Sequence, residues 1–174
     1  MYHVQAIQVL DDQGPTFACP DDITVGTNTT DCERDLNLPD VIVEDACSRI
    51  QSITAEYKVN GVTYTINGTL TNFPGNNLWT PDTLGVIGFA NNLPLGSTDV
   101  KYIVTDDCGN SSVCSFEVTV EDQAPPAAIC DEFTQVSLGI NGMVLINATT
   151  FDDGSYDNCS PVAFKVRRMD SNSC

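Results

Sequence analysis

The feature that most constrains this chain is an internal repeat with a period of roughly 110 residues. Asp12-Gln13-Gly14-Pro15 returns as Asp122-Gln123-Ala124-Pro125, Cys19 returns as Cys130, and Asp45-Ala46-Cys47-Ser48 returns as Asp157-Asn158-Cys159-Ser160. A fixed period of this kind is the mark of a tandem array of domains. We therefore expect the 174 residues to hold one complete copy and an unfinished second one, as a window from a longer array.

The repeat predicts three regions. Residues 12–121 form a complete domain, because a period of this length is enough for a domain with its own core. Residues 122–174 form the first part of a second, diverged domain. Residues 1–11 are predicted to be the last strand of a preceding repeat, or an exchanged strand that completes a neighbouring subunit by β-strand addition.

The cysteine content indicates the redox compartment. The chain contains eight cysteines, and none lies in a CxxC or Cys/His zinc spacing. Such a pattern favours disulfides, and therefore an extracellular or cell-surface location. The single histidine, His3, disfavours a zinc site or a histidine-dependent catalytic group.

The charge excludes several partners. Seven Lys and Arg oppose 24 Asp and Glu, a net charge of −17. Nucleic acids and anionic membranes both require basic surfaces, so neither is an expected partner. No apolar run approaches the roughly 20 residues that span a bilayer. Copies so acidic would repel one another unless cations neutralised them, which makes metal ions natural ligands.

The hydrophobic pattern is that of β-strands. Residues 53–59 and 62–66 both alternate apolar and polar side chains, and Asn60-Gly61 lies between them. Asn-Gly suits a type I′ turn because both central residues need positive φ. This turn predicts a hairpin in which Val59 pairs with Val62, Tyr57 with Tyr64 and Ala55 with Ile66.

Further strands are predicted along both copies. Alternation over 100–104 and 114–120 indicates the last two strands of the complete copy, with Cys114 facing the core, and earlier strands are expected near 22–28, 39–44 and 84–90. The unfinished copy has candidates at 135–138, 143–148 and 162–166. About seven short strands separated by Gly, Pro and Asn predict an all-β fold of tandem β-sandwich domains.

Three blocks of the complete copy resemble a known family. They are GPTFACPDDITV at its start, VEDACS in its middle and LPLGSTDVKYIVTDDCGNSSVCSFEVTVEDQAPP at its end. These blocks are similar to the hyalin repeat, an immunoglobulin-like (Ig-like) extracellular module found in tandem in large secreted or surface proteins, including bacterial adhesins and filaments. The resemblance implies a structural or adhesive role without enzymatic activity. This copy departs from the pattern in Cys32, Cys108 and an insertion between about residues 68 and 95.

Disulfides are predicted from the strand order of such a sandwich. Cys19 opens the first strand and Cys114 the last, while Cys47 and Cys108 lie in loops at the same end. We expect the pairs Cys19–Cys114 and Cys47–Cys108, although four cysteines allow three pairings. Cys32 has no evident partner within its copy, and Cys130 at the start of the next copy is a candidate.

Acidic residues at the joints are candidate calcium ligands. Carboxylates from separate segments should converge there, and Ca²⁺ takes six to eight oxygens. The alternative is that these residues only form turns. The candidates at the first joint are Asp12, Asp45, Asp106 and Asp107, and those at the second are Asp122, Asp153 and Asp157.

The insertion carries three aromatic residues, Phe73, Trp79 and Phe89. They either cover the end of the sandwich or contact a sugar or a neighbouring filament strand. The leading hypothesis is a segment of a long extracellular filament whose partners are neighbouring copies, with glycans or cell surfaces as further ligands. The alternative is a carbohydrate-binding accessory module of a secreted protein.

Overall fold

The computed structural model of the chain describes residues 5, 6, 8, 10–72 and 83–167. The chain divides into two compact units: unit 1 comprises Met1–Gly26 and Glu33–Glu121, and unit 2 comprises Thr27–Cys32 and Asp122–Cys174. The main division lies between Glu121 and Asp122, at the joint where the repeat begins again. The grouping of Thr27–Cys32 with unit 2 has no counterpart in the sequence prediction.

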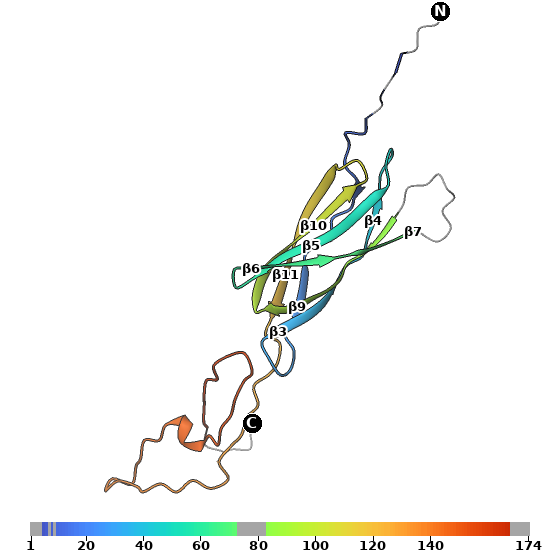
Figure 1. Ribbon diagram of the computed structural model, residues 1–174. Coiled ribbons are helices and arrows are strands. Elements are labelled where there is room, and N and C mark those ends of the chain that lie inside the picture. The colour runs from blue at the N-terminus through green and yellow to red at the C-terminus, as the bar shows by residue number, and fades with distance from the viewer. Residues whose placement is uncertain (1–4, 7, 9, 73–82, 168–174) are drawn as a thin grey trace, which may run out of the picture. The chain divides into compact units, whose positions relative to one another are not determined.

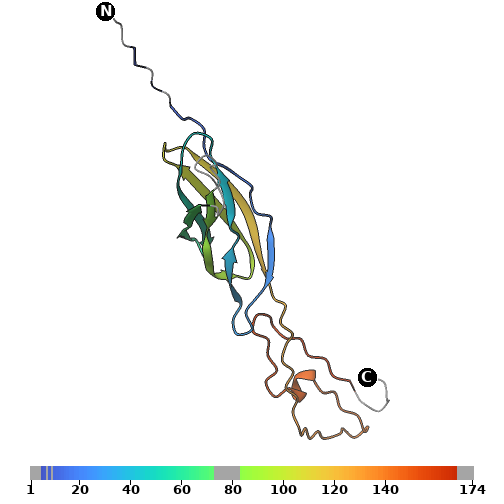
Figure 2. The same cartoon turned by 90° about the vertical axis from the view of Figure 1, so that its right-hand side faces the viewer.

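Unit 1 is an all-β sandwich, and its longest strands run roughly along its length (Figure 1 and Figure 2). In chain order its strands are β1 Thr16–Phe17, β2 Ile23–Gly26, β3 Glu33–Leu38, β4 Val41–Glu44, β5 Ile50–Val59, β6 Val62–Asn67, β7 Thr69–Asn72, β8 Thr83–Val86, β9 Gly88–Pro94, β10 Gly96–Asp106 and β11 Ser111–Glu121. One sheet has the order β1-β4-β8-β7, a second β2-β11-β10-β5-β6, and a third the pair β3-β9. All pairings are antiparallel except that of β11 with β2.

The predicted hairpin is confirmed in its register. Val59 pairs with Val62, Tyr57 with Tyr64 and Ala55 with Ile66 across β5 and β6. Asn60 has φ 51° and Gly61 φ 82°, as a type I′ turn requires. The two strands differ in burial, because β6 is the edge strand of its sheet and leaves Tyr64 exposed.

The core of unit 1 is formed by alternate residues of strands from all three sheets. The long central strand β10 contributes Val100, Tyr102 and Val104, which are fully buried. On β4 the buried residues Val41 and Val43 flank the exposed Ile42, which is the alternation of a half-buried strand. The other buried apolar residues of the described chain are Leu38, Ile53, Ala55, Tyr57, Ile87, Ala90, Leu93, Phe116, Val118 and Val120.

The predictions for the first copy are mostly confirmed, with two differences. The strands expected near 22–28, 39–44, 84–90, 100–104 and 114–120 correspond to β2, β4, β8 with β9, β10 and β11. β3 was not predicted, because its sequence ERDLNL is charged and reads as a loop. The supposed insertion at 68–95 contains β7, β8 and β9, so much of it belongs to the sandwich.

The described residues of unit 2 contain little regular secondary structure. Within its described residues it forms two isolated bridges, Ala127 with Tyr156 and Cys130 with Asp152, and one 3-10 turn at Ala148–Phe151. The strands predicted at 135–138, 143–148 and 162–166 are not formed. Residues 5, 6, 8, 10 and 11, the described part of the predicted N-terminal strand, also form no strand.

Candidate metal centre

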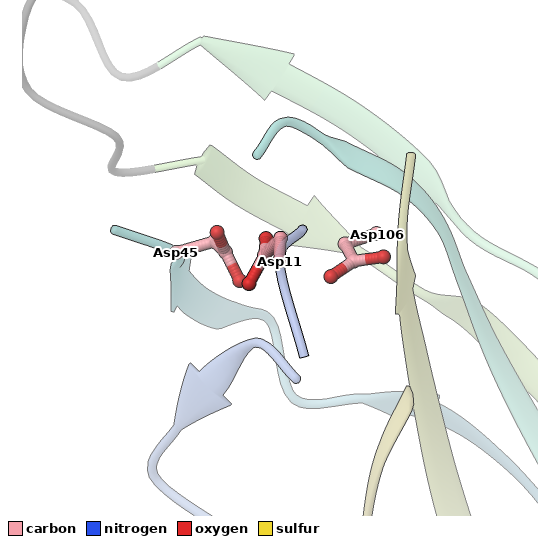
Figure 3. A group of neighbouring side chains, drawn as sticks. All are labelled: Asp11, Asp45 and Asp106. Atoms are coloured by element: carbon pink, nitrogen blue, oxygen red, sulfur yellow. The ribbon is translucent and has the colours of Figure 1, made fainter. Parts of the chain in front are cut away.

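The candidate site lies at the end of unit 1 where the chain enters the sandwich (Figure 1). Three segments meet there: the leading segment (residues 10–15), the turn after β4 and the turn between β10 and β11. Each contributes one aspartate, and one carboxylate oxygen from each of Asp11, Asp45 and Asp106 lies within 4.8 Å of the other two (Figure 3).

Asp106 is held by the turn that follows β10. Its Oδ1 accepts hydrogen bonds from the backbone amides of Cys108 and Asn110, both at 2.8 Å. Its Oδ2 accepts one from the Asn110 side chain at 2.9 Å. Gly109, with φ 91°, allows the chain to turn this tightly.

The hydrogen bonds around Asp106 also fix its charge. The residue is fully buried, and burial by itself raises the pKa of a carboxyl group. The hydrogen bonds from Asn110, Ser48 and Cys108 outweigh this effect and lower the pKa of Asp106 below its ordinary value. The side chain is therefore a buried carboxylate at neutral pH.

Asp45 is positioned by the Asp-Ala-Cys-Ser turn after β4. Its Oδ1 accepts hydrogen bonds from the backbone amides of Cys47 at 2.9 Å and Ser48 at 2.6 Å, and from the Ser48 hydroxyl at 3.0 Å. The residue is 7% exposed. All three bonds end on Oδ1, so Oδ2 takes part in none of them.

Asp11 connects the leading segment to this end of the sandwich. Its backbone oxygen accepts a hydrogen bond from the Asn110 side chain at 3.2 Å, and its Oδ1 accepts one from the Gln13 amide at 3.2 Å. Its Oδ2 is buried and has no hydrogen-bond partner among the described residues. An unpaired buried carboxylate oxygen is costly unless a cation binds it.

The three carboxylates have the properties of a hard-cation site. Two like unit charges about 4 Å apart repel by about 1 kcal/mol in water and about 4 kcal/mol at an effective dielectric constant of 20. A divalent cation held there would remove this repulsion and pair the open oxygen of Asp11. Because every side-chain donor is an oxygen, the set suits Ca²⁺, with carbonyl oxygens or water completing its shell.

Of the four residues predicted at the first joint, the structure brings together two, Asp45 and Asp106. The leading segment supplies Asp11 in place of Asp12, whose carboxylate accepts a hydrogen bond from the Gln13 side chain. Asp107 is exposed and outside the group. The prediction chose the wrong member of the Asp11-Asp12 pair, because sequence does not tell which of two adjacent aspartates faces the turns.

The residues predicted at the second joint do not form such a group, since Asp11, Asp45 and Asp106 are the sole cluster of this kind in the described residues. Asp122 Oδ2 accepts a hydrogen bond from the Ser160 hydroxyl at 2.5 Å. Asp157 Oδ1 accepts the amides of Cys159 and Ser160, which lower its pKa, and Asp153 is exposed. The second copy of the motif therefore forms a turn, the alternative that the sequence left open.

The disulfide predictions have mixed outcomes. Cys19 and Cys114 are joined, with their Cα atoms 5.8 Å apart. Cys47 and Cys108 remain free thiols, contrary to the second predicted pair. Partial burial of the thiol and the carboxylates of Asp11 and Asp106 raise the pKa of Cys108.

Cys32 and Cys130 are also free, so the bridge considered between them is not formed. Of the three aromatic residues in the predicted insertion, Phe73 and Trp79 lie outside the described residues. Phe89 lies on β9, opposite Asn37 of β3, and is 60% exposed. The residue is therefore largely open to solvent.

Comparison with known protein families gives one match. The HYR (hyalin repeat) domain model matches residues 89–120, which run from β9 through β10 to β11. No curated protein sequence matches the chain significantly. No helix among the described residues is long and apolar enough to cross a bilayer.

The match agrees with the resemblance found in the sequence. It covers most of the block that was most specific there, including the last two strands and the turn carrying Asp106. Together with the β-sandwich and its disulfide, it indicates a module of the extracellular adhesion type, since HYR domains are typically extracellular.

Proposed function

We propose that this chain is a structural and adhesive segment of a long filament, secreted or anchored at the cell surface, that is built of tandem Ig-like domains. Its partners are then neighbouring domains of the same protein, with glycans or cell surfaces as further ligands. The internal repeat, the HYR match over residues 89–120 and the Cys19–Cys114 disulfide support this proposal.

The proposal includes a role for Ca²⁺ at Asp11, Asp45 and Asp106, and this cluster is the observation that carries it. Asp11 precedes the first strand, whereas the other two aspartates belong to turns of the sandwich itself. A cation bound by all three ties the leading segment to the domain. Without the cation, repulsion among the carboxylates favours release of that segment, so the ion acts as a stiffener where the chain enters the domain.

Calcium titration of the 174-residue protein tests this role. We expect binding heat in calorimetry and a higher melting temperature with Ca²⁺ than with a chelator. Asp11→Asn should abolish most of the shift because it removes one formal charge from the cluster. Asp12→Asn removes the same charge from the adjacent, exposed position and should leave the shift intact. Equal melting temperatures with Ca²⁺ and chelator in the unmodified protein would contradict a role for calcium.

The filament itself is tested on native material. We expect an intact mass far above the 18.7 kDa of this chain, and fibres or stalks in electron micrographs. Compact, isolated particles with a mass near 18.7 kDa would contradict a long array and favour a strand-exchanging subunit.

The exposed ring of Phe89 favours a second candidate function, that of a carbohydrate-binding accessory module. An aromatic side chain open to solvent on a strand is a surface on which a sugar ring can stack. In this case Phe89→Ala should abolish binding on a glycan array, while Tyr64→Ala, which removes an exposed ring from β6, should not. Absence of any glycan binding by the unmodified protein argues against this candidate.

A further inference from the structure

Unit 2 contains two cysteines that the sequence did not suggest as partners of each other, Cys32 and Cys159. Cys32 ends the segment Thr27–Cys32, which is grouped with Asp122–Cys174 although it connects β2 to β3 in the chain. Cys159 belongs to the Asp-Asn-Cys-Ser turn of the second copy. Both residues are half-buried within this unit.

Asn158 anchors the two segments to each other. Its side-chain amide donates hydrogen bonds to the backbone oxygens of Asn28 and Asp31, both at 3.2 Å. The turn that carries Asn158 is itself held by Asp157, whose Oδ1 accepts the amides of Cys159 and Ser160 at 2.9 and 2.8 Å. The residue next to each cysteine is therefore fixed in place by the opposite segment.

The two thiols make reciprocal contacts. Cys32 Sγ lies 2.8 Å from the backbone oxygen of Asn158, the residue before Cys159. Cys159 Sγ lies 3.7 Å from the backbone oxygen of Asp31, the residue before Cys32. The two side chains also interact with each other. Each side chain thus points at the backbone that carries the other cysteine.

We propose that Cys32 and Cys159 form a disulfide in the mature protein. The Sγ–Sγ bond forms as both S–H bonds break, and two protons and two electrons pass to a small-molecule disulfide such as oxidised glutathione, which becomes two thiols. A protein exposed to an oxidising compartment meets oxidants of this class.

The electrostatic surroundings favour the neutral disulfide over a thiolate. The interaction with the Cys159 thiol, partial burial and the charges of Asp122 and Asp157 raise the pKa of Cys32 to about 11. Metal binding through a thiolate is therefore disfavoured here, because it requires deprotonation. A disulfide carries no charge and is not opposed by the neighbouring carboxylates.

The bond has a consequence for the tandem arrangement. Thr27–Cys32 is continuous with β2 and β3, which belong to unit 1. A bridge from Cys32 to Cys159 therefore joins two segments of unit 2 that lie on opposite sides of the Glu121–Asp122 joint in the chain. Cutting the chain at that joint should then leave the two parts attached until a reductant is added.

A protease site inserted between Gln123 and Ala124 of the full chain tests this. After folding with oxidised glutathione and cleavage, we expect one band on non-reducing electrophoresis and two bands with dithiothreitol. Cys159→Ser should give two bands without reductant, whereas Cys130→Ser, which removes the other candidate partner, should still give one. Two bands from the oxidised protein with all its cysteines would overturn the proposal.

Peptide mapping of the uncut, oxidised protein gives an answer that does not depend on how the variants fold. We expect Cys32 and Cys159 in one linked pair of peptides, next to the pair containing Cys19 and Cys114. Alkylated Cys32, or Cys32 linked to Cys130 or Cys174, would contradict the pairing.

Discussion

Units 1 and 2 contain copies of the same motifs but differ in packing. Every buried apolar residue of the described chain lies in unit 1, and no described residue of unit 2 is buried. Leu93 on β9 is fully buried, whereas Leu145 of unit 2 is 97% exposed. The same kind of alternating sequence therefore forms a core in one unit and remains open in the other.

The turn motif that carries Asp45 in unit 1 and Asp157 in unit 2 has the same local hydrogen bonds in both. Asp45 accepts the amides of Cys47 and Ser48, and Asp157 accepts those of Cys159 and Ser160 in the same way. The turn thus forms from four residues in both copies. The copies differ in what surrounds the turn, because Asp45 is buried beside two other carboxylates, whereas Asp157 contacts Ser160 next to Asp122.

The closing strands account for the difference in packing. In unit 1, β10 lies at the centre of its sheet, between β11 and β5, and the pair β10–β11 has ten residues in register. The described residues of unit 2 contain no counterpart of this pair. Strand candidates such as 143–148 therefore lack a neighbour, and a strand is stable only when its backbone groups are paired.

Removing the Cys19–Cys114 disulfide should cause the largest loss of stability, because it loosens the packing that distinguishes unit 1 from unit 2. Cys19 and Cys114 are 95 residues apart, and a loop of that length corresponds to about 4 to 5 kcal/mol in the chain-entropy model. We expect Cys19→Ser/Cys114→Ser to lower the free energy of unfolding by about that amount, measured by guanidinium denaturation followed by circular dichroism. Cys130→Ser in unit 2 is the control, and an equal loss there would contradict the assignment.

Matched leucine truncations test the packing difference directly. Leu93→Ala should lower the free energy of unfolding by about 2 to 5 kcal/mol, because it opens a cavity in the core. Leu145→Ala should change it by less than about 0.5 kcal/mol, as expected for an exposed side chain. Similar effects of the two substitutions would show that Leu145 is buried in solution.

Two glycines with positive φ, one in each unit, test whether the units unfold independently. Gly61 has φ 82° and Gly142 has φ 72°, and an added Cβ would meet nothing within 4 Å at either position. We expect Gly61→Ala to lower the free energy of unfolding of the sandwich by about 1 kcal/mol, since only backbone strain is added. Gly142→Ala should leave that transition unchanged, because its turn lies in unit 2. A shift with Gly142→Ala would mean that the units unfold together.

The smallest expected effect concerns pH. Hydrogen bonds from the amides of Cys159 and Ser160 lower the pKa of Asp157 below its ordinary value. A carboxyl group with a depressed folded-state pKa stabilises its turn above the unfolded-state pKa and loses that contribution as pH falls through the folded-state value. We expect the amide resonances of both residues to shift in NMR spectra below about pH 4, where a free Asp begins to titrate. In Asp157→Asn the pH dependence should disappear, and its persistence would assign the titration to another group.

The sequence by itself determined the features that depend on short stretches of chain. Asn60-Gly61 defines the hairpin and its register, because few residues other than Gly and Asn adopt the positive φ of this turn. Alternation over 100–104 and 114–120 defined β10 and β11, and the block around them carries the HYR match. The Cys19–Cys114 pair followed from the strand order that these elements imply.

Only the tertiary structure decided which of these local signals acquire partners. It placed Asp11, rather than Asp12, beside Asp45 and Asp106, and it set Cys32 against Cys159 instead of Cys130. It also paired the charged segment of β3 with β9 while leaving the alternating segments of unit 2 without neighbours. The physical reason is that turns and alternation are set by neighbours in the chain, whereas burial, ligand clusters and cysteine pairs depend on segments brought together only by folding.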